Sequence, residues 1–248
     1  MDNEPPIIQI TQDDLEKVQT QQEITINSEE LLNNHGQVRL NEKVFSEICN
    51  RTVQHNNENS GEFWLFLIGK NDVADETVEV GIGYHSGVSA NTNEVVEKLR
   101  PFTENGYKVI ADYHNHPKQS VLDYEALNLS DEDAISPSIS DIESDIYPTV
   151  KEKLGQVDYP RIIGTVSEKK GVIMGGFQIL RQPNYEEEKQ IEIEEPIYIV
   201  EEPDENGITL KPSLYTDPRK MVQLGIIKPV DVLIPVVNSS DITMPSPF

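Results

Sequence analysis

The sequence predicts an α/β protein of the α+β type, in which a mixed β-sheet is flanked by helices. Apolar runs of strand length recur between residues 62 and 180. Stretches with apolar residues at helical spacing lie among them. The chain has 248 residues, enough for one well-cored domain with extensions or for two small domains.

Composition divides the chain into three parts. Residues 1–35 are rich in Asp, Glu, Gln and Asn and predict a polar N-terminal arm. Residues 36–182 carry the regular apolar patterns and predict the core domain. Residues 183–248 begin strongly acidic and become proline-rich, which indicates a C-terminal extension whose role the sequence does not define.

Two helices are predicted in the first half of the core domain. Asn41 is placed to cap a helix over NEKVFSEICNRTV, and HNNENSG (55–61) reads as a loop. Four apolar residues of this first helix share one face: Val44, Phe45, Ile48 and Cys49. A second helix is expected over 91–99, with a break at Pro101.

Five strands are predicted in the core domain. EFWLFLIG (62–69) is continuously apolar, as expected of a strand buried on both faces. The other four predicted strands cover 77–84, 107–113, 161–166 and 172–180, with a Glu-Lys-Lys-Gly turn between the last two. An acidic, Ser-rich loop spans 118–140, and a helix is expected to start near Ser140 or Asp141.

The strand over 107–113 runs directly into His-Asn-His-Pro. Side chains two apart on a strand point the same way, so His114 and His116 can offer two imidazoles to one metal ion. A catalytic zinc site needs a third protein ligand and an open position. No histidine follows His116, which excludes the amidohydrolase barrels that need later histidines and favours a carboxylate ligand.

Together with two further elements, this motif resembles the JAMM (JAB/MPN) zinc metalloprotease family. The family pattern is an upstream Glu, then His-x-His-Pro, then Ser-x-x-Asp. Its positions are matched here by Glu62, His114, His116, Pro117, Ser138 and Asp141. The resemblance covers roughly residues 36–182 and implies a curved, cytidine-deaminase-like sheet of the JAB/MPN type.

The resemblance also implies a role for each residue. His114, His116 and Asp141 would hold Zn²⁺, and Glu62 would take a proton from water and return it to the leaving amine. Ser138 would donate a hydrogen bond to the oxyanion. Two plainer interpretations stay open: Glu62 as a carboxylate that caps a strand, and Ser138 as a helix N-cap.

The last element of the motif has two rivals inside the acidic loop. Ser120/Asp123 and Ser130/Asp133 also fit Ser-x-x-Asp. We favour Ser138/Asp141, because Pro137 precedes it and a helix is expected to follow, and we place Ser130/Asp133 second.

Three functions fit the motif. The leading one is a zinc peptidase or isopeptidase acting on a protein or peptide substrate, with a ubiquitin-like tail as the substrate that the resemblance suggests. The alternatives are a non-catalytic MPN-like scaffold and a small-molecule hydrolase. Because every position of the motif is filled, we expect an active enzyme.

Net charge and the absence of recognisable targeting patterns guide the expectations for partner and compartment. With 44 acidic and 20 basic residues, the net charge is −24, which argues against nucleic acid as a partner. We found no secretory signal or membrane span in the sequence, so we expect a soluble, cytoplasmic protein with a single reduced cysteine, Cys49. The sequence leaves the oligomeric state unknown. His35 and His55 are expected to be solvated, and His85 to be exposed.

Overall fold

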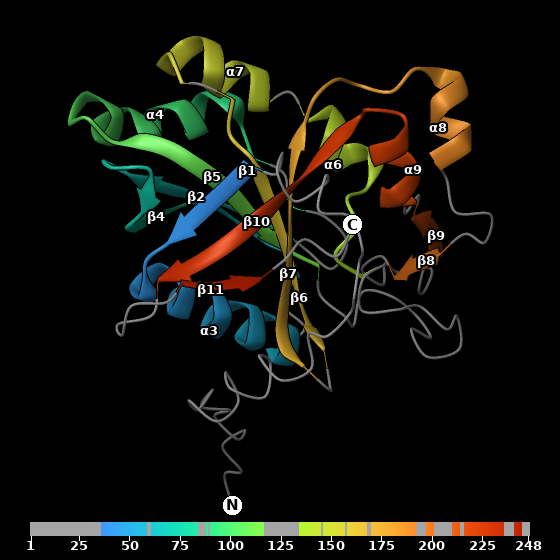
Figure 1. Ribbon diagram of the computed structural model, residues 1–248, viewed down its shortest axis with the longest axis horizontal. Coiled ribbons are helices and arrows are strands. Elements are labelled where there is room, and N and C mark those ends of the chain that lie inside the picture. Colours follow the sequence, from blue (N-terminus) through green and yellow to red (C-terminus); the bar gives the residue numbers. More distant parts are fainter. Residues whose placement is uncertain are drawn as a thin grey trace, which may run out of the picture.

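One mixed sheet of nine strands organises the chain (Figure 1). Eight strands follow the order β3 (Val73–Ala74), β1 (Gly36–Leu40), β10 (Ile227–Pro235), β7 (Gly171–Ile179), β6 (Arg161–Ser167), β5 (Lys108–Asn115), β2 (Phe63–Gly69) and β4 (Glu76–Ile82). Strand β11 (Asp241–Met244) pairs with β10, and β8 (Ile197–Val200) and β9 (Leu210–Ser213) form a separate antiparallel pair. The computed structural model describes residues 36–58, 61–83, 88, 90–116, 134–144, 146–156, 158–167, 170–191, 197–200, 210–213, 216–235 and 241–244.

The sheet contains both parallel and antiparallel pairs. β1 is parallel to β3 and β10, and β5 is parallel to β6, whereas the other neighbours are antiparallel. β3, at one end of this order, lies close to β2, near the other end. The N–H of Asp75, just after β3, donates to the carbonyl of Ile68 on β2 at 3.0 Å. The sheet is therefore nearly closed, and the predicted mixed sheet flanked by helices is confirmed at this level.

Strand β2 shows why its sequence is continuously apolar. Phe63, Leu65 and Leu67 point to one face of the sheet and pack against the helix α3 (Glu42–Glu58). Trp64 and Phe66 point to the opposite face, which is covered by α4 (Thr92–Glu104) and α7 (Ile146–Leu154). Figure 1 shows α3 below the sheet and α4 and α7 above it. Both faces of β2 are thus buried, as the apolar run predicted.

The helices α3 and α4 begin where the sequence places them. The Asn41 side chain accepts from the Val44 N–H at 2.8 Å, and Asn91 is the N-cap of α4. The ends differ from the prediction. The break at Pro101 is wrong, because α4 continues through it to Glu104. Pro101 is exposed, so water can serve the carbonyl that loses its partner, while Phe102 continues the packing of the helix.

The predicted loop at 55–61 is also wrong over its first half. Helix α3 runs to Glu58, and His55 is buried rather than solvated. The imidazole Nδ1 of His55 lies 3.2 Å from the Gly61 carbonyl, and its ring lies 4.6 Å from that of Phe63. These tertiary contacts stabilise a last turn whose polar sequence reads as a loop.

Part of the predicted C-terminal extension lies within the sheet. β10 occupies the position between β1 and β7, parallel to the first and antiparallel to the second. A third apolar cluster joins α8 (Tyr185–Ile191) and α9 (Pro218–Gln223) to α6 (Ile139–Glu143) through Ile191, Met221 and Ile142. Residues after 182 therefore contribute directly to the packing around α6.

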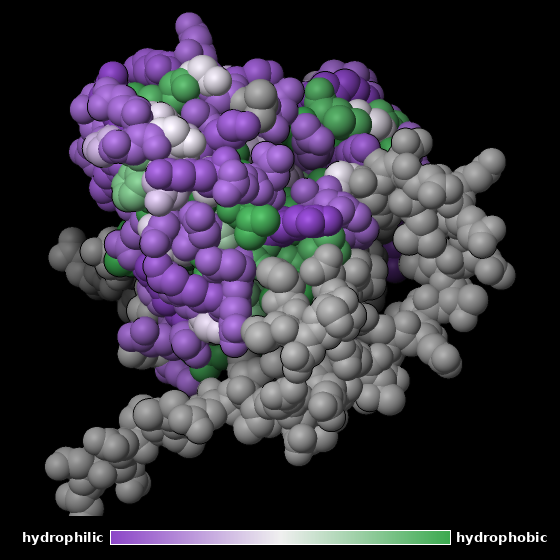
Figure 2. All heavy atoms as spheres, turned by 60° about the vertical axis from the view of Figure 1, so that its left-hand side comes forward, coloured by the Kyte–Doolittle hydropathy of each residue, from purple (hydrophilic) through white to green (hydrophobic). Residues whose placement is uncertain are grey.

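On the face that Figure 2 shows, the described surface is largely hydrophilic. Large hydrophobic side chains are exposed there at Ile82, Leu180 and Tyr185. Within the described part of the chain, no helix combines the length and apolar character needed to cross a membrane.

Candidate metal centre

The two histidines of His-x-His lie at the end of β5, His114 on the strand and His116 directly after it. β5 runs between β2 and β6, with His114 paired to Trp64 on one side and to Ile163 on the other. His116 follows the strand and stays attached to β6, because its N–H donates to the Gly164 carbonyl at 2.8 Å. Both histidine residues are buried, with exposed fractions of 3% and 8%.

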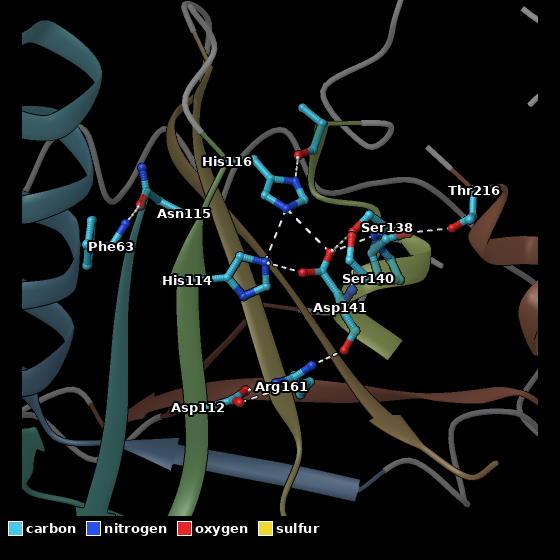
Figure 3. Close-up of polar contacts among 12 residues, drawn as sticks. Phe63, Asp112, His114, Asn115, His116, Ser138, Ser140, Asp141, Arg161 and Thr216 are labelled. Atoms are coloured by element: carbon cyan, nitrogen blue, oxygen red, sulfur yellow. Dashed lines mark hydrogen bonds and ion pairs between the residues drawn. The ribbon is translucent and has the colours of Figure 1, made fainter. Parts of the chain in front are cut away.

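The Asp141 carboxylate completes a triad with these imidazoles (Figure 3). The two Nε2 atoms are 3.2 Å apart, and Asp141 oxygens lie 3.1 Å from Nε2 of His114 and 3.7 Å from Nε2 of His116. Ligand atoms on a tetrahedron around zinc, with bonds of about 2.0–2.1 Å, are separated by about 3.3 Å. The three groups therefore have the spacing of a tetrahedral metal site.

The tautomer of His116 also suits a metal. Its Nδ1 lies 3.0 Å from the carbonyl oxygen of Ala134, which only accepts hydrogen bonds, so Nδ1 carries the proton. The Nε2 lone pair then points towards His114 and Asp141. A backbone carbonyl on the far nitrogen is a common way of orienting a metal-binding histidine.

Asp141 is held by the start of the short helix α6. Ser138 is the N-cap, and its backbone N–H and hydroxyl donate to Oδ2 of Asp141 at 2.7 Å and 2.8 Å. The Asp141 N–H in turn donates to the Ser138 hydroxyl oxygen at 3.2 Å. This reciprocal capping box, a local consequence of the Ser-x-x-Asp spacing, fixes the carboxylate towards the histidines.

Charge couples the three groups. Burial opposes ionisation of Asp141, but the nearby His114 and His116 outweigh it and hold the pKa of the carboxyl well below its usual value. Burial also lowers the pKa of His116, but hydrogen bonding and attraction to Asp141 reverse the effect and raise it. Both pKa shifts show that this site favours a positive charge beside the Asp141 carboxylate.

Glu62 stands immediately before β2, beside the triad. Burial raises the pKa of its carboxyl, while the charges of His116 and His114 act in the opposite direction. The carboxylate also accepts a hydrogen bond from the Val88 N–H. A half-buried carboxylate that senses both imidazoles is in a position to exchange protons beside a bound metal.

Asn115, the residue between the two histidines, holds the backbone on both sides of Glu62 in place. Asn115 points to the opposite face of β5, where its Oδ1 accepts from the Phe63 N–H at 2.7 Å and its Nδ2 donates to the Gly61 carbonyl at 3.4 Å. These bonds hold the residues on both sides of Glu62. The sequence reasoning missed Asn115, although strand alternation directs it away from the histidines.

Three further buried groups were missed. Arg161 on β6 pairs with Asp112 on β5, and the Thr216 hydroxyl donates to the Pro137 carbonyl just before the N-cap of α6. The available signal for the pair of Asp112 and Arg161 was a charged residue in each of two predicted strands, YKVIADY and RIIGTV. Nothing local to Thr216 indicated its partner.

The structure thus brings the side chains of His114, His116 and Asp141 together around one point, with Ser138 supporting Asp141. The Glu62 carboxyl is close enough for its pKa to respond to these three groups. The Ser138 hydroxyl is engaged with Asp141, and its role towards an oxyanion stays a prediction. The rival matches Ser120/Asp123 and Ser130/Asp133, together with Pro117, His35 and His85, lie outside the described residues.

Comparisons with known proteins leave the family open. The chain matches no protein-family model and no curated protein. One solved structure that resembles it is the solution structure of protein DSY2949 from Desulfitobacterium hafniense, with 13% identity, 70% of this chain and 89% of that chain covered, and a TM-score of 0.37. The function of this chain must therefore be argued from the geometry of its own triad.

Proposed function

We propose that this chain is a zinc-dependent peptidase or isopeptidase of the JAMM type, with a JAB/MPN-like fold. The observation that carries the proposal is the triad of His114, His116 and Asp141 at tetrahedral spacing. Two imidazole nitrogens and one carboxylate oxygen suit zinc and leave a fourth position open. Bound zinc supplies a Lewis acid that makes water a nucleophile at neutral pH.

Glu62 handles the proton in this proposal. Its carboxylate accepts a proton from the attacking water and delivers it to the nitrogen of the leaving amine. The raised pKa of Glu62 suits this exchange, because a carboxyl whose pKa lies closer to neutrality both accepts and releases a proton more readily. Asn115 keeps the flanking peptides in place during the exchange.

Ser138 serves two purposes in the proposal. Its backbone N–H keeps Asp141 oriented, which leaves the hydroxyl able to turn from Asp141 towards the oxyanion. Ser138→Ala should therefore retain zinc while turnover falls by about 10²- to 10³-fold, the usual worth of one oxyanion donor. A variant with normal turnover and reduced stability would leave only the N-cap role.

The proposed substrate is the amide or isopeptide bond of a protein, with an extended ubiquitin-like tail as the first candidate, and the proposed compartment is the cytoplasm. The net charge of −24 favours a basic protein partner over nucleic acid. Support for the enzyme over a non-catalytic scaffold comes from the filled triad with a carboxylate beside it.

Zinc content and the Glu62→Gln variant test the function. Elemental analysis should find about one zinc per chain. On a panel of peptides and ubiquitin-like fusions, Glu62→Gln should retain zinc and lose about 10²- to 10⁴-fold in turnover. Glu104→Gln, an exposed carboxylate on α4, is the matched control and should behave as wild type.

Each negative outcome has a distinct meaning. If the wild-type protein binds no zinc, the proposed zinc enzyme is ruled out and the non-catalytic MPN-like scaffold remains. Zinc binding with cleavage of small amides alone would indicate the small-molecule hydrolase. A Glu62→Gln variant that turns over normally would rule out the JAMM mechanism even if the fold is right.

A further inference from the structure

The ligands of the proposed metal site come from two separate elements. His114 lies on β5 and His116 follows it, whereas Asp141 lies on α6. The capping box orients the Asp141 carboxylate within α6, but it does not set the distance from α6 to the sheet. Some contact must hold α6 against β5 at the spacing that a metal requires.

Arg161 lies between these two elements. It is paired in register with Asp112 on the neighbouring parallel strand, so both side chains emerge on the same face of the sheet. Asp112 is two residues before His114 and therefore shares that face with the histidine. The Arg161 Nε donates to the Asp112 oxygens at 3.3 Å and 3.0 Å.

The other end of the guanidinium reaches α6. The Arg161 Nη1 donates to the backbone carbonyl of Asp141, the ligand residue itself. Figure 3 shows the Arg161 side chain with Asp112 on one side and the Asp141 backbone on the other. Arg161 and Asp112 have exposed fractions of 2% and 0%, and Trp64 lies against the guanidinium, 5.4 Å from its carbon to the ring centroid.

We propose that Arg161 is a positioning residue that sets the place of Asp141 relative to His114 and His116. The planar guanidinium presents donors in a rigid fork, so one side chain fixes two acceptors at a constant separation. A lysine has a single nitrogen on a flexible stem and cannot reproduce that separation. This inference rests on the proposed metal site.

Energetics favour a positioning role over a purely stabilising one. A buried ion pair is weak evidence of stability, because desolvation of both charges offsets their attraction. Contacts behind metal ligands, by contrast, typically change metal affinity by about 10- to 100-fold when they are removed. Arg161 and Asp112 therefore matter most through the geometry of the ligands above them.

The test compares Arg161→Lys with Tyr113→Phe. Tyr113 lies on the opposite face of β5, where its hydroxyl is buried 2.5 Å from that of Thr52. Tyr113→Phe thus removes a buried hydrogen bond from the same strand without touching the metal face. Zinc affinity is measured by competition with a chromophoric chelator, stability by thermal unfolding without metal, and geometry by the visible spectrum of the cobalt-loaded protein.

Arg161→Lys should raise the Kd for zinc by about 10- to 100-fold and alter the cobalt spectrum. Tyr113→Phe should lower the melting temperature and leave both metal readouts unchanged. Equal zinc affinity in Arg161→Lys and wild type overturns the inference alone, whereas a wild type that binds no zinc overturns the proposed function. Equal zinc weakening in both variants also overturns the inference.

A second variant covers loss of folding. If Arg161→Lys does not fold, the double variant Arg161→Met with Asp112→Leu replaces the ion pair by an apolar pair, which often preserves stability. Its Kd for zinc should again rise by about 10- to 100-fold. Wild-type affinity in the double variant would overturn the positioning role.

Discussion

The two faces of β5 carry opposite chemistry on one strand. Towards α3, Ala111 and Tyr113 join an apolar cluster, and Asn115 ties down the residues around Glu62. Towards α6, Asp112 and His114 are equally buried but polar, and they meet Arg161 and Asp141. The comparison shows that burial alone does not define a core position: one face provides packing, and the other groups the side chains of the candidate metal site.

The largest effect is expected from removing a candidate metal ligand on the polar face of β5, the face that carries Asp112 and His114. His116→Ala removes one of three protein ligands and should strip zinc from the protein, as measured by elemental analysis after dialysis. His55→Ala is the control, because this buried histidine contacts Gly61 and Phe63 instead of the triad. It should lose stability and keep zinc. Full zinc occupancy in His116→Ala would contradict the assignment.

The same measurement decides between the rival acidic residues. Asp141→Ala should lose zinc, whereas Asp133→Ala should retain it. The reverse pattern would move the third ligand to the Ser130/Asp133 match.

Acid should empty the metal face without a mutation. The pKa of His116 is raised by Asp141, and a protonated imidazole cannot bind metal. The affinity for zinc should thus be highest above the raised pKa of His116 and should fall as the pH drops through that pKa. The carboxyl of Asp141 stays ionised over this range, because its pKa is lowered. Chelator competition at pH 7.5 and 5.5 measures the change. An unchanged affinity would show that His116 is not a ligand.

A substitution on the apolar side should affect stability alone. Leu65 is fully buried against α3 on the strand next to β5. Leu65→Ala should lower the free energy of unfolding by about 2–5 kcal/mol, as large-to-small core changes do. Denaturant titration measures the loss, and zinc per folded chain should stay at the wild-type value. Loss of zinc from the folded variant would show that the two faces are not independent.

The smallest effect concerns Cys49, which packs in the same apolar cluster. Burial raises the pKa of its thiol to about 12, from 9.0. Above pH 9 the unfolded chain ionises before the native one, so stability is lost as the pH rises. Between pH 8 and pH 10 wild type should lose about 1.4 kcal/mol more than Cys49→Ala, from denaturant titrations at each pH. Equal losses would mean that the native thiol titrates normally.

Much of the candidate metal site could be predicted from the sequence because its determinants are local. Strand alternation places His114 and His116 on one face, and the Ser-x-x-Asp spacing produces the capping box that orients Asp141. The continuous apolar run of β2 likewise indicated burial on both faces. Each of these features depends on residues only a few positions apart.

The tertiary structure decided which distant residues support that site. Arg161 meets Asp112 because β6 lies parallel to β5, and Thr216 reaches Pro137 because the C-terminal residues pack beside α6. The insertion of β10 between β1 and β7 is of the same kind. The sequence by itself determined the candidate ligands and the face that the two histidines share, because periodicity depends on neighbouring residues. Strand order and long-range partners depend on how the whole apolar surface is buried, which no local pattern encodes.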